Sequence, residues 1–330
     1  MQQGSLLWVY EGMTQYLGNV LAARSGLKSQ SQYRDILALS AAQLDTKSGR
    51  QWRSTEDTAI AASILRGGNP AWSNWKRGQD YYQEGELFWL DVDTLIRKNT
   101  NNAKSLNDFE HIFLGKGGNT GPLIATYNRE ELVKDLSQVM PYDWAGFIHT
   151  HIDNINPRAD LDGIERGGYK LVYNETPNDA QKTIASTGGR RAGGSFWYTL
   201  GLQVTADGLI SDVRWGGPGD AAGLAPGMRI LAVNGNVVSP EALHGAIKEA
   251  KSGSEPIHLI TQADTFVSTH DLTYHDGERY PALVRIDNIN PRADLDGIER
   301  GGYKLVYNET PNDAQIVSYT HLTLPTIYSV

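Results

Sequence analysis

The first 27 residues carry an apolar pattern that predicts one long amphipathic helix. Large apolar side chains recur at three- and four-residue spacing between residues 6 and 27, and Gly26 fits a left-handed cap at the end of the helix. Glu11 stands at the edge of the apolar face. A buried carboxylate is costly unless a cation or hydrogen-bond donors satisfy it, so Glu11 needs a metal ion, an arginine or a path to solvent. The predicted apolar face consists of Leu6, Val9, Tyr10, Met13, Leu17, Val20 and Leu21.

Similar patterns predict helices as far as about residue 150. Tyr82 precedes one of these patterns, and an aromatic packing residue with its hydroxyl in water is one interpretation of it. His149 and His151 would lie on one side of a β-strand, a spacing that occurs in metal sites. Because no third ligand is near them in the sequence, we interpret them as a surface or packing pair. The predicted helices cover residues 29–44, 54–64, 87–96, 105–114 and 130–136.

The composition of the chain changes after residue 151. Residues 151–194 contain frequent Pro, Gly and Asp residues around one short predicted strand, followed by a Gly-rich stretch. This composition predicts an interdomain segment and linker. Residues 195–285 predict a second, α+β domain. Its strands are expected at 198–204, 210–215, 229–235 and 257–260. A short helix is expected within 216–224 and a longer one at 239–250.

Composition narrows the class of protein. The chain has 330 residues, of which 40% are hydrophobic and 21% charged, so it is long enough for two or three globular domains. The formal charge of -8 without a basic cluster argues against a nucleic-acid surface, and no apolar run reaches the roughly 20 residues of a membrane span. The absence of cysteine excludes disulfides and thiolate metal sites. A bacterial periplasm and a cytoplasm both stay open as compartments.

The stretch WVYEGMTQYLG, residues 8–18, is similar to the segment that carries the third zinc ligand in the glycyl-aminopeptidase family of gluzincin peptidases. By this resemblance Glu11 is a zinc ligand, beside two histidines and the general base of an upstream HExxH helix, and a zinc-bound water attacks the scissile carbonyl of a peptide substrate. Tyr82, three residues before Gly85, is similar to the tyrosine of the YxKG segment, whose hydroxyl helps to hold the oxyanion. The sequence departs from that segment at Glu84, where lysine is usual.

The second domain resembles a PDZ domain, and the run AGLAPGMRILAVNG, residues 222–235, is its most specific part. Leu200, Gly201 and Leu202 match the carboxylate-binding loop. The resemblance implies a groove in which a peptide C-terminus adds a strand beside the 239–250 helix. A domain used only for packing or dimerisation is the alternative.

Two features limit the interpretation. Residues 152–181 recur without a change at 286–315, which is unlike a stacked repeat, and the tail that follows resembles a translated adapter, so we expect residues 286–330 to carry no function. None of the eight histidines is followed by Glu, so HExxH is absent. We therefore expect a C-terminal fragment whose N-terminal part and targeting signal are missing, and which is inactive and binds no zinc by itself.

The expected fold is multi-domain: a mainly α-helical C-terminal part of a thermolysin-like peptidase, residues 1–150, followed by an α+β PDZ domain. The expected parent is a bacterial zinc metallo-aminopeptidase that removes N-terminal residues, glycine preferred, from peptides. A non-catalytic PDZ peptide-binding module and the PDZ-bearing tail of another protease are the alternatives. Residues 1–285 contain no G-x-S-x-G elbow, which disfavours a serine protease.

Overall fold

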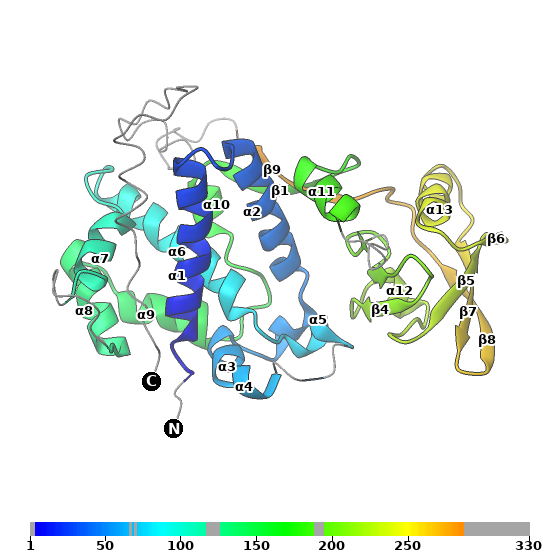
Figure 1. Ribbon diagram of the computed structural model, residues 1–330, viewed down its shortest axis with the longest axis horizontal. Helices are drawn as coiled ribbons and strands as arrows, with labels where there is room; N and C mark the ends of the chain where they lie inside the picture. Colours follow the sequence, from blue (N-terminus) through cyan, green and yellow to red (C-terminus); the bar gives the residue numbers. More distant parts are fainter. Residues whose placement is uncertain (1–3, 66–67, 69–70, 117–125, 188–194, 287–330) are drawn as a thin grey trace.

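The computed structural model describes residues 4–65, 68, 71–116, 126–187 and 195–286 (Figure 1). The predicted function-free region, residues 286–330, lies outside these ranges apart from its first residue, and so does most of the Gly-rich linker. Among the helices in the described part of the chain, none has the length and apolar character needed to cross a membrane. The described residues form a helical body, residues 4–187 together with the last strand, and a C-terminal unit, residues 195–279.

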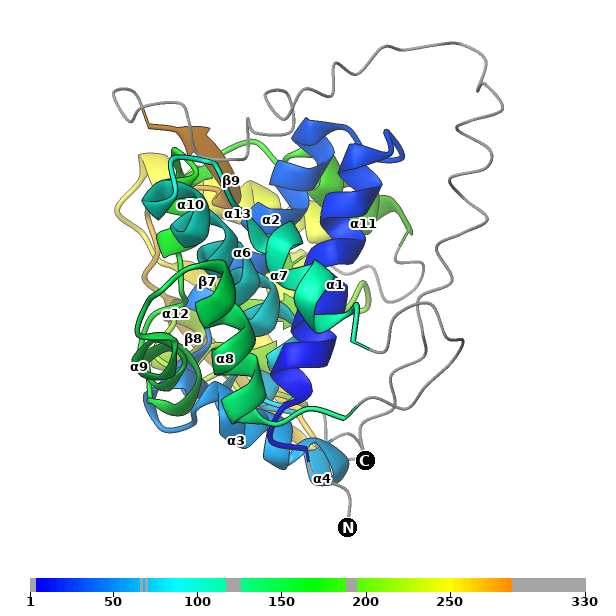
Figure 2. The same ribbon diagram turned by 90° about the vertical axis from the view of Figure 1, so that its left-hand side faces the viewer.

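Helices α1 (Leu7–Arg24), α2 (Gln30–Asp45) and α6 (Tyr81–Asn99) form the centre of the helical body. Helices α7 (Leu106–Phe113), α8 (Arg129–Val139) and α9 (Trp144–Ile148) lie at the end of this body that faces away from the C-terminal unit (Figures 1 and 2). The remaining helical elements are η1 (Ser48–Gln51), α3 (Thr55–Ile60), α4 (Ala62–Leu65), α5 (Ser73–Lys76), the π-helical η2 (His149–Asp153), α10 (Asp162–Arg166) and α11 (Asp179–Thr187).

The closest approach of α1 and α6 is a glycine pair. A Cβ atom on Gly12 would lie 2.4 Å from the Gly85 Cα, and a Cβ on Gly85 would lie 2.5 Å from the Gly12 Cα. Carbon atoms that are not bonded to each other pack at about 3.5–4.0 Å, so neither position has room for a side chain. The two glycines therefore allow backbone-to-backbone packing at the centre of the helical body.

The helix expected at residues 6–27 is present, but its buried face is rotated from the predicted one. Leu21 is 41% exposed, whereas Trp8, Tyr16 and Asn19 are buried. The reason is the crossing with α6 at Gly12, since the buried stripe runs along Trp8, Gly12 and Tyr16. The predicted cap is confirmed, because Gly26 has a φ of +78°.

A two-stranded sheet joins distant parts of the chain. Strand β1 (Tyr169–Asn174) pairs antiparallel with β9 (Tyr280–Arg285), with Tyr169 opposite Arg285. The side chain of Tyr169 is part of the helical core, and Leu283 packs against that core. Strand β9 thus returns to the helical body after the C-terminal unit. The domain limits at residues 150 and 195 stay a prediction.

The C-terminal unit contains two small sheets around helix α13 (Pro240–Ser252). One sheet has the order β2-β3-β4 and the other the order β6-β5-β7-β8. The turn between β5 and β6 uses Asn234 and Gly235, both with positive φ, as an Asn-Gly hairpin requires. The strands are β2 (Ser195–Phe196), β3 (Leu202–Val204), β4 (Ile210–Val213), β5 (Arg229–Val233), β6 (Asn236–Val237), β7 (Ile257–Ala263) and β8 (Phe266–Leu272), and helix α12 spans Pro218–Ala221.

Two strand predictions for this unit differ from the structure. Residues 198–201 form a loop, and β3 begins only at Leu202. The predicted last strand is followed by β8, which pairs along its whole length with β7 and forms the outer edge of the sheet. The pattern missed β8 because most of its side chains are exposed on both faces, Phe266 by 74%.

Polar and aromatic contacts hold the C-terminal unit against the helical body. The Trp215 ring lies 5.2 Å from that of Trp75, and the Ser73 hydroxyl donates to the Asp212 carboxylate at 2.5 Å. Beside these contacts is a cleft of about 480 Å³. Most of its lining residues are polar, among them Gln43 from α2 and Gln203 from β3.

Candidate functional site

Glu11, the predicted zinc ligand, is half-buried on the second turn of α1 and directly precedes Gly12. Burial is the main cause that raises the pKa of Tyr127 well above its usual value, and the charges of Tyr10 and Glu11 add to it. The Glu11 carboxylate therefore lies near Tyr127, the residue that precedes the N-cap Asn128 of α8. Its role as a ligand stays a prediction.

Tyr82, the predicted oxyanion donor, lies in the first turn of α6. Its ring is half-buried and stacks on that of Tyr81, with 4.8 Å between the centroids. Gly85, one turn further along α6, packs on Gly12. The crossing of α1 and α6 thus brings together the two helices that carry Glu11 and Tyr82, although these residues are 71 positions apart in the sequence.

Glu84, the departure from the YxKG segment, has a structural role. It is 4% exposed and accepts hydrogen bonds from the guanidinium groups of Arg50 and Arg77, which are 2% and 1% exposed. The distance from Arg77 Nη2 to Glu84 Oε1 is 2.6 Å. Arg50 also donates to the carbonyls of Asn156 and Arg158. Glu84 therefore holds two buried cations that tie η1 and the residues after η2 to the start of α6.

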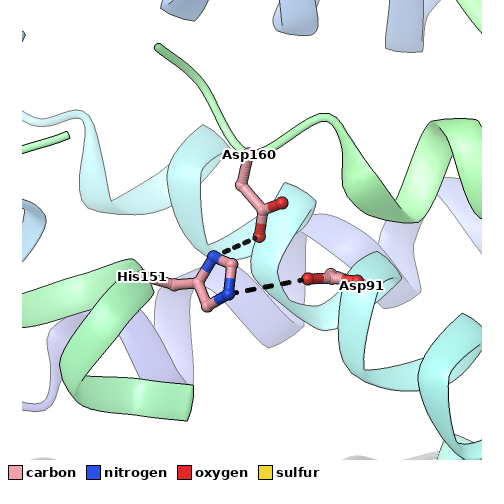
Figure 3. Close-up of side chains that lie close together, drawn as sticks. All are labelled: Asp91, His151 and Asp160. Carbon is pink, nitrogen blue, oxygen red and sulfur yellow. Dashed lines mark ion pairs between the residues drawn. The ribbon is translucent and has the colours of Figure 1, made fainter. Parts of the chain in front are cut away.

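A second group of ionisable side chains consists of Asp91, His151 and Asp160 (Figure 3). The side-chain atoms of these residues that could bind a metal ion lie within 4.8 Å of one another. Among the residues that the structure describes, this is the one set of three His, Asp or Glu residues with such spacing. His151 Nδ1 is 3.1 Å from Asp160 Oδ2, and His151 Nε2 is 4.0 Å from Asp91 Oδ2. The imidazole thus lies between two carboxylates from α6 and from the segment before α10.

Charge and burial shift the titration of this group. Burial, and then the charge of Asp160, raise the pKa of Asp91 to about 7. For His151, burial lowers the pKa, but the hydrogen bond and charge of Asp160 and the charge of Asp91 outweigh it, so the net shift is upward. The guanidinium of Arg166 pairs with the other oxygen of Asp91. The two carboxylates therefore stabilise the protonated form of His151.

This geometry fits an ion-pair network better than a metal site. The two ring nitrogens face different carboxylates (Figure 3), whereas one cation bound to one nitrogen would need both carboxylates on the same side of the ring. Arg166 already neutralises Asp91. We interpret the cluster as a network that fixes η2 against α6.

The strand predicted around the two histidines is wrong. His149 and His151 lie in the π-helical η2, so their rings diverge, and His149 points outward to Asp153. The signal for a helix was the apolar spacing of Trp144, Ile148 and Ile152, all of which are buried. The interpretation as a packing pair missed the network of His151, because Asp91 is distant in the sequence.

In the C-terminal unit, the predicted carboxylate-binding loop directly precedes β3 and includes its first residue, Leu202. Leu200 and Leu202 are both 0% exposed, and Gly201 between them has a φ of +72°. The Gly201 N–H donates to the carbonyl oxygen of Phe196 at 2.9 Å. No pattern in the sequence singles out Phe196. Peptide binding by this loop stays a prediction.

Comparison with known proteins gives one family match and one similar fold. Residues 1–88 match the family model of the M61 glycyl aminopeptidase. A solved structure described as an aminopeptidase N family protein from Idiomarina loihiensis has a TM-score of 0.68 at 18% identity; the match covers 90% of this chain and 49% of that one. The chain thus spans about half the length of that structure, and the likeness is one of fold.

The other comparisons add little. A photosystem II D1 C-terminal processing protease gives a TM-score of 0.19 at 15% identity, covering 61% of this chain and 44% of that one, which carries no argument about the fold. No curated protein matches the chain. The residues that match the family model include Glu11, Gly12, Tyr82 and Gly85, which carry the resemblance seen in the sequence. That resemblance is confirmed for the first 88 residues, which match the model of the M61 glycyl aminopeptidase family.

Proposed function

We propose that residues 1–285 are part of a zinc metallo-aminopeptidase that hydrolyses N-terminal residues, glycine preferred, from peptides. The observation that carries the proposal is the crossing of α1 and α6 at Gly12 and Gly85. It joins the helices of Glu11 and Tyr82, and the family match covers both residues. In this proposal Glu11 binds zinc, and the Tyr82 hydroxyl donates to the oxyanion of the reacting carbonyl.

The described residues do not fit a complete zinc site. Zinc in catalytic sites needs three protein ligands, and Glu11 belongs to no group of three His, Asp or Glu side chains in the described ranges. In this proposal the other two ligands lie outside the described ranges. We propose that this chain by itself is inactive and binds no zinc at Glu11.

We also propose that the C-terminal unit is a PDZ domain that binds peptide C-termini. The order of its elements supports this: the loop around Gly201, strand β3, and helix α13 with Leu243, Ala246 and Ile247 packed into the same core. Backbone N–H groups of such a loop can hold a carboxylate, and β3 can accept an extended strand. The alternative, a unit that serves only for packing, is favoured by its contacts with the helical body through Trp215.

Activity measurements on a longer protein that contains residues 1–285 test the enzyme proposal. Tyr82→Phe should lower kcat about a hundredfold on a glycyl substrate and leave the zinc content unchanged, because it removes one hydroxyl donor to the oxyanion. Tyr142→Phe is the matched control, since Tyr142 is 46% exposed on the helical body. An unchanged kcat for Tyr82→Phe would remove Tyr82 from the reaction. Equal kcat/KM values for glycyl and leucyl substrates would refute the glycine preference.

A further inference from the structure

We propose that the chain itself closes the peptide groove of the C-terminal unit, because β2 and its Phe196 occupy the place of a peptide's C-terminal residue. The inference rests on the proposed peptide-binding function and adds the regulation of that site. It predicts which ligand can compete: an extended peptide with a free carboxylate and a large apolar last residue.

The backbone of β2 occupies the edge of β3 that a peptide would need. Ser195 lies opposite Gln203, and Phe196 lies opposite Leu202, in antiparallel register. The other edge of β3 is paired with β4. A peptide that adds a strand to β3 must use the edge opposite β4, and at the start of β3 this edge is already paired.

The hydrogen-bond donors of the loop are also engaged. The carbonyl oxygen of Phe196 accepts from the Gly201 N–H at 2.9 Å and from the Thr199 hydroxyl at 3.1 Å. A C-terminal carboxylate bound in this loop would need the same donors. The Phe196 carbonyl therefore stands where an oxygen of the carboxylate would be.

The side chain of Phe196 fills the apolar site between β3 and α13. It is 1% exposed, and its ring centroid is 4.7 Å from that of His244 on α13. Leu202 of β3 and Leu243 of α13 belong to the same buried cluster. An apolar terminal side chain of a peptide would enter this site only after Phe196 leaves it.

The closure is weak enough for a ligand to reverse. Strand β2 has only two register pairs with β3, and Ser195 is exposed. A peptide that pairs along β3 and places an apolar terminal residue in the Phe196 site makes the same contacts and adds a free carboxylate. Such a peptide competes with β2, and removal of the Phe196 ring favours the peptide.

The test uses the full 330-residue chain and fluorescein-labelled decapeptides that end in Phe, Leu or Val, with affinity measured by anisotropy. Phe196→Ala should raise the affinity for at least one peptide tenfold or more over the original chain. Amidation of the peptide C-terminus should abolish this gain. Leu272→Ala, which truncates another fully buried side chain of the same unit on β8, should leave the affinity unchanged.

The outcomes separate the two proposals. Equal, measurable affinities of the original chain and Phe196→Ala would overturn the closure and leave peptide binding in place. No binding by either protein, both folded by circular dichroism, would overturn peptide binding and the closure with it.

A cross-link gives a second test that does not depend on truncating the core. The chain has no cysteine, and Ser195 and Gln203 are register partners whose side chains line the same cleft. In the double variant Ser195→Cys, Gln203→Cys, oxidation should form the disulfide, and it should lower peptide affinity at least tenfold until dithiothreitol restores it. Failure to form the disulfide, or an affinity that oxidation does not change, would overturn the closure.

Discussion

Glu86 gives the sharpest prediction about stability. This carboxyl is 0% exposed on α6, and its Oε1 accepts a 2.7 Å hydrogen bond from the Asn19 amide of α1. Burial raises its pKa to about 7 from the usual 4.5, although Asn19, Ser40 and the charge of Lys28 act in the opposite direction. The folded protein therefore favours the neutral acid.

The sign of the pH effect follows from that shift. A carboxyl whose pKa is higher in the folded state costs nothing below the unfolded pKa, and it lowers stability progressively as pH rises from 4.5 toward 7. A shift of roughly 2.5 units at about 1.4 kcal/mol per unit corresponds to about 3 kcal/mol above pH 7. Glu86→Gln keeps a carbonyl acceptor for Asn19 and carries no charge.

Guanidinium unfolding of Glu86→Gln and the original chain, followed by helical circular dichroism, measures this effect. The variant should gain about 3 kcal/mol at pH 8 and close to nothing at pH 4.5. Glu130→Gln, an exposed position in the first turn of α8, should show no such pH dependence. A difference between Glu86→Gln and the original chain that is the same at both pH values would refute the reasoning.

Two further predictions concern packing and charge, and urea unfolding checks both. Glu84→Gln should lower the free energy of unfolding by about 3–5 kcal/mol, because Arg50 and Arg77 lose their buried partner. The control Asp57→Asn should lower it by less than about 1 kcal/mol, because the pair of Asp57 with Arg53 is partly exposed. Equal losses in the two variants would contradict the role of burial. Gly85→Ala should destabilise the protein by several kcal/mol, because the new methyl group meets the α1 backbone. The control Gly18→Ala, at a position on α1 with open space around it, should stabilise the protein by up to about 1 kcal/mol. A Gly85→Ala protein as stable as the original would show that the crossing can relax.

Local sequence signals predicted the starts of α2 and α8 to within one residue, whereas α6 begins six residues before the predicted start at 87. Ser29 and Asn128 cap α2 and α8, and each is followed three residues later by the Gln32 or Glu131 of a capping box. These signals work because donor and acceptor are only three residues apart. The register of the Asn234-Gly235 hairpin was predictable for the same reason.

Contacts between distant segments could not be predicted in this way. Nothing in the pattern around Gly12 indicates that Gly85 will lie against it, and that contact decides which side of α1 is buried. The pairing of β1 with β9 joins strands more than 100 residues apart, again without a local signal. For Glu11 and Tyr82, the resemblance supplied the roles, and the fold supplies the crossing that relates their helices.

The most direct test of the central proposal is the zinc affinity of a longer protein that contains residues 1–285, measured by competition with a chromophoric chelator. Glu11→Gln should weaken zinc binding at least tenfold, because a neutral amide replaces a charged ligand, whereas Glu130→Gln should leave it unchanged. Zinc bound by the Glu11→Gln protein as tightly as by the original would contradict the assignment of Glu11 as a ligand.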